Sequence, residues 1–358
     1  MEYSTKTQLD STIIPFEIRR NIPKIYKFTN IYYYDNSFHY CGDKTIKKRK
    51  CIPHLLGEHF KIDHKIVHPM DKCLVIDTAY VFWPMSLNNI GHFMYDNLLA
   101  LYKMIATEQD KLDINTDVRI FFVRRPKEKI KEQTITPKEI EIFKVFSRHK
   151  VQFMKKIKQP IFIKNVIMQK TDMKTRPWKE YDSDLKNDQV NKDFFKSFIG
   201  LIKKQFNIES VKKPHRIVLL SRNGAKWRRV PNEDKLIQKL KQSNYNVESV
   251  KFENLSLKEE ITLMSETKIF IAPYGAGVMA SSCFLPSTST CIIINPIGFA
   301  FKHDFPTMLV TFTKRLDIKI LTWVNDIGKV GKNIYASRDA NMKININKVL
   351  GMLKDIGK

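Results

Sequence analysis

A histidine and an aspartate four residues apart could together perform acid–base chemistry. His92 and Asp96 lie in the stretch LNNIGHFMYDNLLALYKMIA, residues 87–106. Apolar side chains recur there at helical spacing, and the pair falls on roughly the opposite side of the expected helix. A carboxylate that accepts a hydrogen bond from one imidazole nitrogen leaves the other nitrogen to take a proton from a substrate. The spacing therefore fits a general base, with either residue as the base, but a surface ion pair would have the same spacing.

A basic stretch could bind an anion. In LLSRNGAKWRRVPNED, residues 219–234, Arg222, Arg228 and Arg229 follow a short buried apolar run. Guanidinium groups bind phosphate oxygens through paired N–H donors. The stretch therefore predicts a phosphate site, and the alternative is an ordinary basic surface loop.

A small-residue turn could let a ligand approach the backbone. In APYGAGVMASSCFLPSTSTCIIINP, residues 272–296, Tyr274, Gly275, Ala276 and Gly277 stand between two strand-like runs. We expect a helix to begin near Val278, and the N–H groups and positive dipole at a helix start attract an anion, most simply a diphosphate. A tight turn without a ligand would have the same sequence.

The second half of the chain alternates strands and helices. We expect strands at 215–221, 246–252, 268–273 and 290–296, and helices at 232–243 and 257–264. Asn232 is a candidate helix cap, and Ser256 with Glu259 forms a capping box. This alternation predicts right-handed crossovers and a parallel sheet. The basic stretch and the glycine turn then lie side by side at the sheet edge where ligands bind.

The first half contains strand-like runs at 31–41, 72–83, 118–124 and 160–168, with one clear helix. A polar stretch at 169–189 lacks apolar periodicity and indicates a boundary between two domains, 1–185 and 186–358. An amphipathic helix is expected after it, from the spacing of Phe194, Phe195, Phe198, Ile199 and Ile202.

Composition limits the class of protein and of partner. The chain has 358 residues, is 43% hydrophobic and can fill two cores. Its formal net charge of +25 favours anionic partners, namely nucleotide phosphates, an anionic membrane surface or nucleic acid. Nucleic acid is the least favoured partner, because no nucleic-acid-binding module is recognisable.

The cysteines argue against a zinc site and a disulfide framework, and the apolar runs argue against an export signal and a membrane span. The five cysteines show neither zinc-ligand spacing nor a disulfide framework, so we expect buried free thiols. The N-terminal stretch lacks the apolar core of a signal peptide, and no uncharged apolar run is long enough to span a membrane. From these features alone we expect a soluble, cytoplasmic protein.

Together, NNIGHFMYD, LLSRNGAKWRRVPNE and APYGAGVMASSCFLPSTSTCIIINP resemble, in order and spacing, the motifs of glycosyltransferase family 61 over roughly residues 80–300. That family includes eukaryotic O-linked N-acetylglucosaminyltransferases and plant xylan-decorating enzymes. The resemblance implies an α/β, GT-B-like fold with two Rossmann-like domains facing across a cleft. Residues 1–185 would form the acceptor-side domain, and residues 186–358 would bind the nucleotide-sugar.

The resemblance also implies an activity and roles for the three groups. The expected reaction is transfer of a sugar, with inversion, from a nucleotide-sugar such as a UDP-sugar to a hydroxyl of a glycan or protein, with no cofactor and no essential metal. His92, oriented by Asp96, would take the acceptor proton. Arg222, with Arg228 or Arg229, would hold the diphosphate, and Gly275, Ala276 and Gly277 would donate backbone N–H groups. Eukaryotic relatives work in the secretory lumen, which is the alternative location.

The sequence departs from the family pattern at two positions. Tyr274 stands where the family usually has histidine, and Ile293 where it usually has a glutamate suited to bind a donor ribose. These changes could alter donor specificity, weaken donor binding or mark an inactive member that only binds glycan or nucleotide. A basic nucleic-acid-binding protein is the rival from another class.

Overall fold

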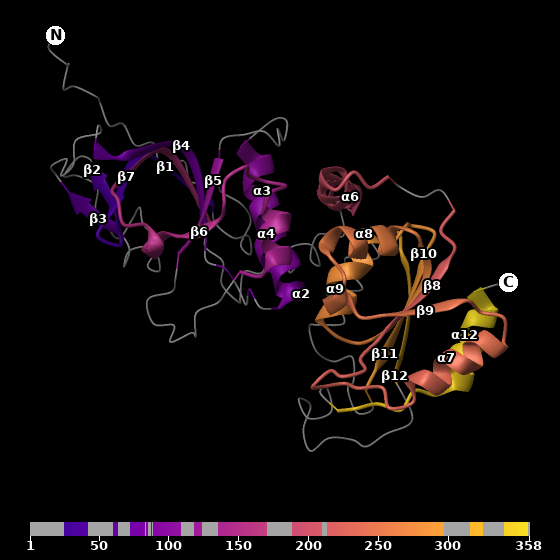
Figure 1. The fold of residues 1–358 in the computed structure, drawn as a ribbon. Helices are drawn as coiled ribbons and strands as arrows, with labels where there is room; N and C mark the ends of the chain where they lie inside the picture. The colour runs from indigo at the N-terminus through magenta and orange to yellow at the C-terminus, as the bar shows by residue number, and fades with distance from the viewer. Residues whose placement is uncertain are drawn as a thin grey trace, which may run out of the picture. The chain divides into compact units, whose positions relative to one another are not determined.

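The computed structural model describes residues 25–41, 60–63, 72–82, 84, 87, 89–108, 118–123, 135–169, 188–209, 213–296, 316–324 and 340–356. The chain divides into two compact units, Met1–Ser183 and Asp184–Lys358 (Figure 1). The domain boundary expected at 185 falls in residues 170–187, which lie outside the described residues.

The first unit is built on a seven-stranded mixed sheet. Its order is β3-β2-β1-β7-β4-β5-β6. The four strands from β7 to β6 are parallel, and β1 runs antiparallel to both of its neighbours. The strands are β1 (Ile25–Tyr34), β2 (Ser37–Cys41), β3 (Phe60–Asp63), β4 (Leu74–Phe82), β5 (Val118–Phe122), β6 (Gln152–Phe153) and β7 (Ile161–Gln169).

Each strand-like run expected in this half forms at least one strand. The run at 31–41 forms a hairpin rather than one strand, because Asp35 and Asn36 turn the chain with φ of 47° and 53°. Both φ values lie in the left-handed region that Asp and Asn tolerate, as two-residue hairpins require.

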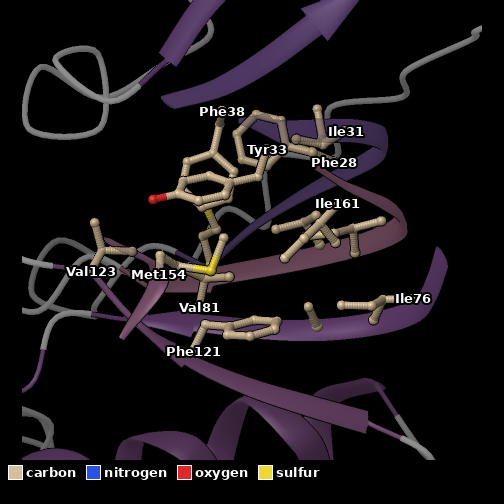
Figure 2. Packing of buried hydrophobic residues seen from close by; sticks show 14 residues of the cluster. Phe28, Ile31, Tyr33, Phe38, Ile76, Val81, Phe121, Val123, Met154 and Ile161 are labelled. Atoms are coloured by element: carbon tan, nitrogen blue, oxygen red, sulfur yellow. The ribbon is translucent and has the colours of Figure 1, made fainter. Parts of the chain in front are cut away.

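The core of this unit gathers apolar side chains from five strands. Figure 2 shows ten of them labelled, including Phe28 and Phe38 from the hairpin and Phe121 from β5. The rings of Tyr33 and Phe38 lie 5.0 Å apart, and burial raises the pKa of Tyr33 to about 12. The hairpin is therefore anchored to the parallel strands by a shared apolar cluster.

The helix expected at 87–106 extends from residue 90 to 108 and has a wider middle. It consists of α2 (Ile90–His92), a π-helical segment η2 (Phe93–Leu98) and α3 (Leu99–Glu108). All six residues of η2 are buried, so the expected polar face opposite the apolar stripe is absent from this segment. One side packs on α4 (Pro137–Phe143), where Phe93 meets Phe143 edge to face.

The second unit is a doubly wound α/β domain. Its five strands are all parallel in the order β12-β11-β10-β8-β9. They are β8 (Arg216–Leu220), β9 (Val247–Val250), β10 (Thr267–Pro273), β11 (Thr290–Asn295) and β12 (Lys319–Val324). The first four confirm the predicted strands, and the sheet is parallel, as the alternation predicts; β12 has no counterpart among the predicted strands.

Helices cover both faces of this sheet (Figure 1). One face carries α7 (Glu233–Gln242) and α12 (Ile346–Ile356), which share an apolar cluster with Ile292 and Ile294. The other face carries α8 (Leu257–Ser265) and α9 (Ala276–Ser281), and the amphipathic helix α6 (Asp188–Gln205) precedes the sheet in the chain. Ser256 and Glu259 form the expected capping box at the start of α8.

Asn232 occupies the N-cap position of α7 but does not cap it. Its side chain exchanges two hydrogen bonds with the backbone of Ile344, which is 112 residues away. A tertiary contact therefore outcompetes the local one that the sequence predicts.

Two further expectations concern thiols and membranes. Cys283 and Cys291 are buried thiols outside any disulfide, as expected, and burial raises the pKa of Cys291; Cys73 is partly exposed. The side chains of Cys41 and Cys51 lie outside the described part of the chain. In the described helices, no segment is long and apolar enough to cross a bilayer.

Candidate active site

The strand order of the second sheet contains one topological switch point, between β8 and β10. Counted from β9, the strands stand in the order β9, β8, β10, β11 and β12. After β8 the chain first forms β9 on one side of it and then crosses to form β10 on the other side. At such a switch point the loops after the two central strands diverge, and ligands bind there in open α/β sheets. The basic stretch follows β8, and the glycine turn follows β10.

Arg228 joins these two segments. Its guanidinium Nη1 donates a hydrogen bond to the carbonyl oxygen of Tyr274 at 3.0 Å, across 46 positions of sequence. A Cβ atom on Gly275 would lie 2.9 Å from the same nitrogen. The chain therefore places a cation directly against the turn that the sequence singles out.

The backbone of Arg228 is strained, and its neighbours hold it. Its φ of 56° lies in the left-handed region, which a long side chain rarely adopts. Beside it, the N–H of Arg229 donates to Asn341, and the Nε of Arg229 donates to the Ala225 carbonyl. Such strain persists only where the surroundings over-determine the conformation, and it often marks a functional site.

Arg222 and Arg229 make different contacts from Arg228. The side chain of Arg222 donates to the carbonyl of Trp227 at 2.9 Å, and its backbone N–H donates to the carboxylate of Glu233. Thus both arginines bind groups of their own loop, and Arg228 is the one that reaches the glycine turn. Glu233 belongs to the same motif, but its residue type alone did not mark it as a partner of Arg222.

Neither glycine is required by an unusual φ, and of the two Gly275 is the one that lacks room for a side chain. Gly275 has an extended backbone with φ of 164°, which any residue can adopt, so the close guanidinium is the reason for glycine there. A Cβ on Gly277 would lie 3.4 Å from Leu220, an ordinary close contact between α9 and β8. Helix α9 begins at Ala276, and the first N–H groups of a helix have no intrahelical acceptor.

The two departures from the family pattern are both buried. The side chain of Tyr274 is buried, and its backbone N–H donates to Ile294. Ile293 lies in β11 opposite Ala272 and is 2% exposed. Neighbours along a strand point to opposite faces, so Ile293 faces away from the cluster that holds Ile292 and Ile294.

His92 and Asp96 form a short contact within the first unit. The imidazole Nδ1 lies 2.5 Å from the carboxylate Oδ2. The side chain of Asp96 is 1% exposed and that of His92 is 13% exposed. Among the described residues, the second carboxylate oxygen of Asp96 has no hydrogen-bond partner. The pair is thus mostly buried, with the histidine nearer the solvent.

Two asparagines hold the backbone of His92 from both directions. The Asn89 side chain accepts hydrogen bonds from the N–H groups of Gly91 and His92, and so caps the helix. The buried Asn97 side chain donates to the His92 carbonyl at 3.2 Å. The helix-cap preference of asparagine could have revealed Asn89 from sequence. Asn97 acts through the π-helical turn, which no sequence pattern announced.

Comparison with known families settles the class of the protein. The family model described as Glycosyltransferase 61 matches residues 64–293, more than half of the chain and all three groups above. The chain belongs to glycosyltransferase family 61. This glycosyltransferase has the two successive α/β units of the expected GT-B-like fold class. No curated protein matches its sequence.

Three solved structures show weak similarity to this family 61 enzyme. A glycosyl transferase of family 9 from Veillonella parvula is 8% identical, with 79% of this chain and 97% of that chain covered and a TM-score of 0.36. The E. coli heptosyltransferase WaaC with ADP-2-deoxy-2-fluoro heptose is also 8% identical, with 78% and 99% covered and a TM-score of 0.32. The iron-containing dodecameric glycosyltransferase TibC from enterotoxigenic E. coli is 10% identical, with 80% of each chain covered and a TM-score of 0.33. None is similar enough to assign a detail of this enzyme's site.

Within the described residues, no group of three or more His, Cys, Asp or Glu side chains is arranged to hold a metal ion. Among the described residues, Arg228 places a cationic group against the glycine turn.

Proposed function

We propose that this glycosyltransferase transfers a sugar from a nucleotide-sugar, most simply a UDP-sugar, to a hydroxyl of a glycan or protein acceptor, with inversion and without an essential metal. The observation that carries the proposal is the placement of Arg228 against Tyr274 and Gly275 at the switch point. Family membership supports a nucleotide-sugar as the donor.

Arg228 would stabilise the leaving group. When the bond from the anomeric carbon to the phosphate oxygen breaks, negative charge grows on the nucleoside diphosphate. A guanidinium fixed before the reaction begins stabilises that charge without reorganising. The N–H groups of Gly275, Ala276 and Gly277 would add donors, while Arg222 and Arg229 keep the loop in shape.

His92 would act as the base. As the acceptor oxygen forms its bond to the anomeric carbon, its proton would pass to Nε2 of His92, because Nδ1 is held by Asp96. Attack from the face opposite the departing phosphate inverts the configuration. The exposure of the two side chains favours His92 over Asp96, since the carboxylate is almost fully buried.

The donor site is tested by nucleotide binding. We expect UDP to raise the melting temperature of the enzyme and Arg228→Gln to weaken UDP binding by about tenfold or more, the usual worth of hydrogen bonds to a charged group. Arg216→Gln is the matched control, because Arg216 lies at the opposite end of β8 and pairs with Glu248 and Glu266. Equal affinity in both variants, or no binding of UDP, GDP or ADP, would contradict the donor site.

The stereochemistry and the metal requirement need a separate measurement. The anomeric configuration of the product, followed by NMR from a donor of known configuration, should be inverted. The rate should be unchanged by EDTA. A product with retained configuration would exclude the single displacement, and a rate abolished by EDTA and restored by a divalent cation would show that a metal is required.

A further inference from the structure

One aromatic side chain stands out at the edge of the proposed donor site. Trp227 is 50% exposed, although large apolar side chains are normally buried. Its sequence neighbours are Lys226, Arg228 and Arg229, and the ammonium of Lys226 lies 5.1 Å from the centre of the indole ring. An exposed aromatic ring among cations fits a ligand that combines a flat ring with negative charge.

The backbone places Trp227 at the switch point of the second sheet. Its carbonyl oxygen accepts a hydrogen bond from Arg222, two residues beyond the end of β8. The next residue, Arg228, reaches the carbonyl of Tyr274 after the end of β10. The backbone of Trp227 is therefore held in the loop after β8, next to the residue that contacts the loop after β10.

The loop fixes the backbone of Trp227 before any ligand binds. The left-handed conformation of Arg228 and the hydrogen bonds of Arg222 and Arg229 determine the course of the chain on both sides of Trp227. A pre-organised side chain loses less conformational entropy on binding than one on a mobile loop. Tryptophan also has only two side-chain torsions to order.

We propose that Trp227 stacks on the nucleobase of the nucleoside diphosphate whose phosphates bind Arg228. This inference rests on the proposed function, and it adds the residue that recognises the base. The two ends of one nucleotide would then be bound by two consecutive side chains, with the phosphates at Arg228 and the base at Trp227. Because every base has a π-face, this contact contributes affinity for all nucleotides and does not by itself select uracil.

The experiment removes either the ring or the base. Dissociation constants for UDP and for inorganic pyrophosphate are measured by calorimetry with the wild type, Trp227→Phe and Trp227→Ala. We expect Trp227→Ala to weaken UDP binding by about fivefold to 150-fold, the range for loss of one base–aromatic stack. Trp227→Phe should retain most of the affinity, and pyrophosphate should bind all three proteins equally.

Three results would overturn the inference. Unchanged UDP affinity in Trp227→Ala would show that the ring does not contact the base. An equal loss for UDP and pyrophosphate would show that the substitution disturbs the loop instead of a stack. A loss confined to single-stranded oligonucleotides, with UDP unaffected, would assign the ring to nucleic acid.

The failure of the proposed function has a distinct result. A wild-type protein that binds neither UDP, GDP nor ADP has no donor site of the proposed kind, whatever Trp227 does. UDP binding that depends on Arg228 but not on Trp227 would leave the donor site intact and reject only the stacking role.

Discussion

At the residue scale, the contact between Arg228 and the glycine turn explains why glycine stands at position 275. The extended backbone there suits any residue, but a side chain would meet the guanidinium at 2.9 Å. The requirement is for space beside a cation and not for an unusual φ. A sequence can show that a position is glycine, but the structure shows which of these reasons applies.

We predict that Gly275→Ala weakens UDP binding by about tenfold, because the new methyl group displaces the guanidinium from its hydrogen bond to Tyr274. The melting temperature should change little, since alanine can adopt the extended backbone. Gly200→Ala is the control: nothing lies within 4 Å of its Cβ in α6, and it should stabilise the helix by roughly 0.5–1 kcal/mol without affecting UDP. UDP affinity equal to the wild type would refute this role of Gly275.

We predict that His92→Ala lowers turnover by about 10² to 10⁴, the usual contribution of general-base catalysis, while UDP affinity is retained. Asp96→Asn should cost less, because Asp96 acts through the imidazole it contacts. The double variant should be little worse than His92→Ala. Turnover is measured per folded molecule, because both side chains are mostly buried. If Asp96→Asn abolishes transfer and His92→Ala only slows it, Asp96 is the base.

At the element scale, a π-helical segment positions the pair of His92 and Asp96. π-Helical segments are rare in proteins, and many of those that occur lie at functional sites. Here η2 directly follows α2, and the carbonyl oxygen of His92 accepts a hydrogen bond from the side chain of Asn97, five residues later. The helix cap at Asn89 fixes the other side of the same peptide region. The geometry of His92 thus depends on residues that contact its backbone and not its ring.

We predict that Asn89→Ala lowers both stability, by roughly 0.5–2 kcal/mol, and turnover, because two N–H groups at the start of α2 lose their acceptor. Asn89→Asp keeps an oxygen acceptor and should restore most of the turnover. Thr136→Ala removes the cap of α4 in the same unit and should cost similar stability with no loss of turnover per folded molecule. An Asn89→Ala enzyme with normal turnover per folded molecule would show that the cap is only structural.

At the scale of the whole molecule, each unit has its own sheet and its own apolar core, and the chain as a whole carries a formal net charge of +25. Such a charge attracts any polyanion at low salt. Arg222, Arg228 and Arg229 lie in one short loop of the second unit, so a small anion bound there should respond to salt less steeply than a polyanion bound along the surface.

We predict that nucleic-acid binding falls steeply with salt and UDP binding does not. A polyanion held by 6 to 10 phosphate contacts loses about 10³ to 10⁵ in affinity between 50 and 200 mM salt. UDP at a compact site should lose less than about tenfold over the same range. The measurement is titration of both ligands at three salt concentrations, with vesicles of anionic and neutral lipid as a further comparison. Tight oligonucleotide binding that survives 200 mM salt would favour a nucleic-acid function.

The sequence alone predicted four of the five strands of the second unit and its helices α6, α7 and α8, because apolar periodicity and a capping box are local features, but it did not predict β12 or α12. It also located the three chemical groups, since their residue types and order along the chain identify the family. Residue type and order could not distinguish Arg228 from Arg222 and Arg229, because the three arginines differ only in what they contact. The left-handed backbone of Arg228, the diversion of Asn232 to Ile344 and the burial of Asp96 in a π-helical turn were decided by the tertiary structure. Each depends on partners distant in sequence or on a helix geometry that side-chain periodicity does not encode.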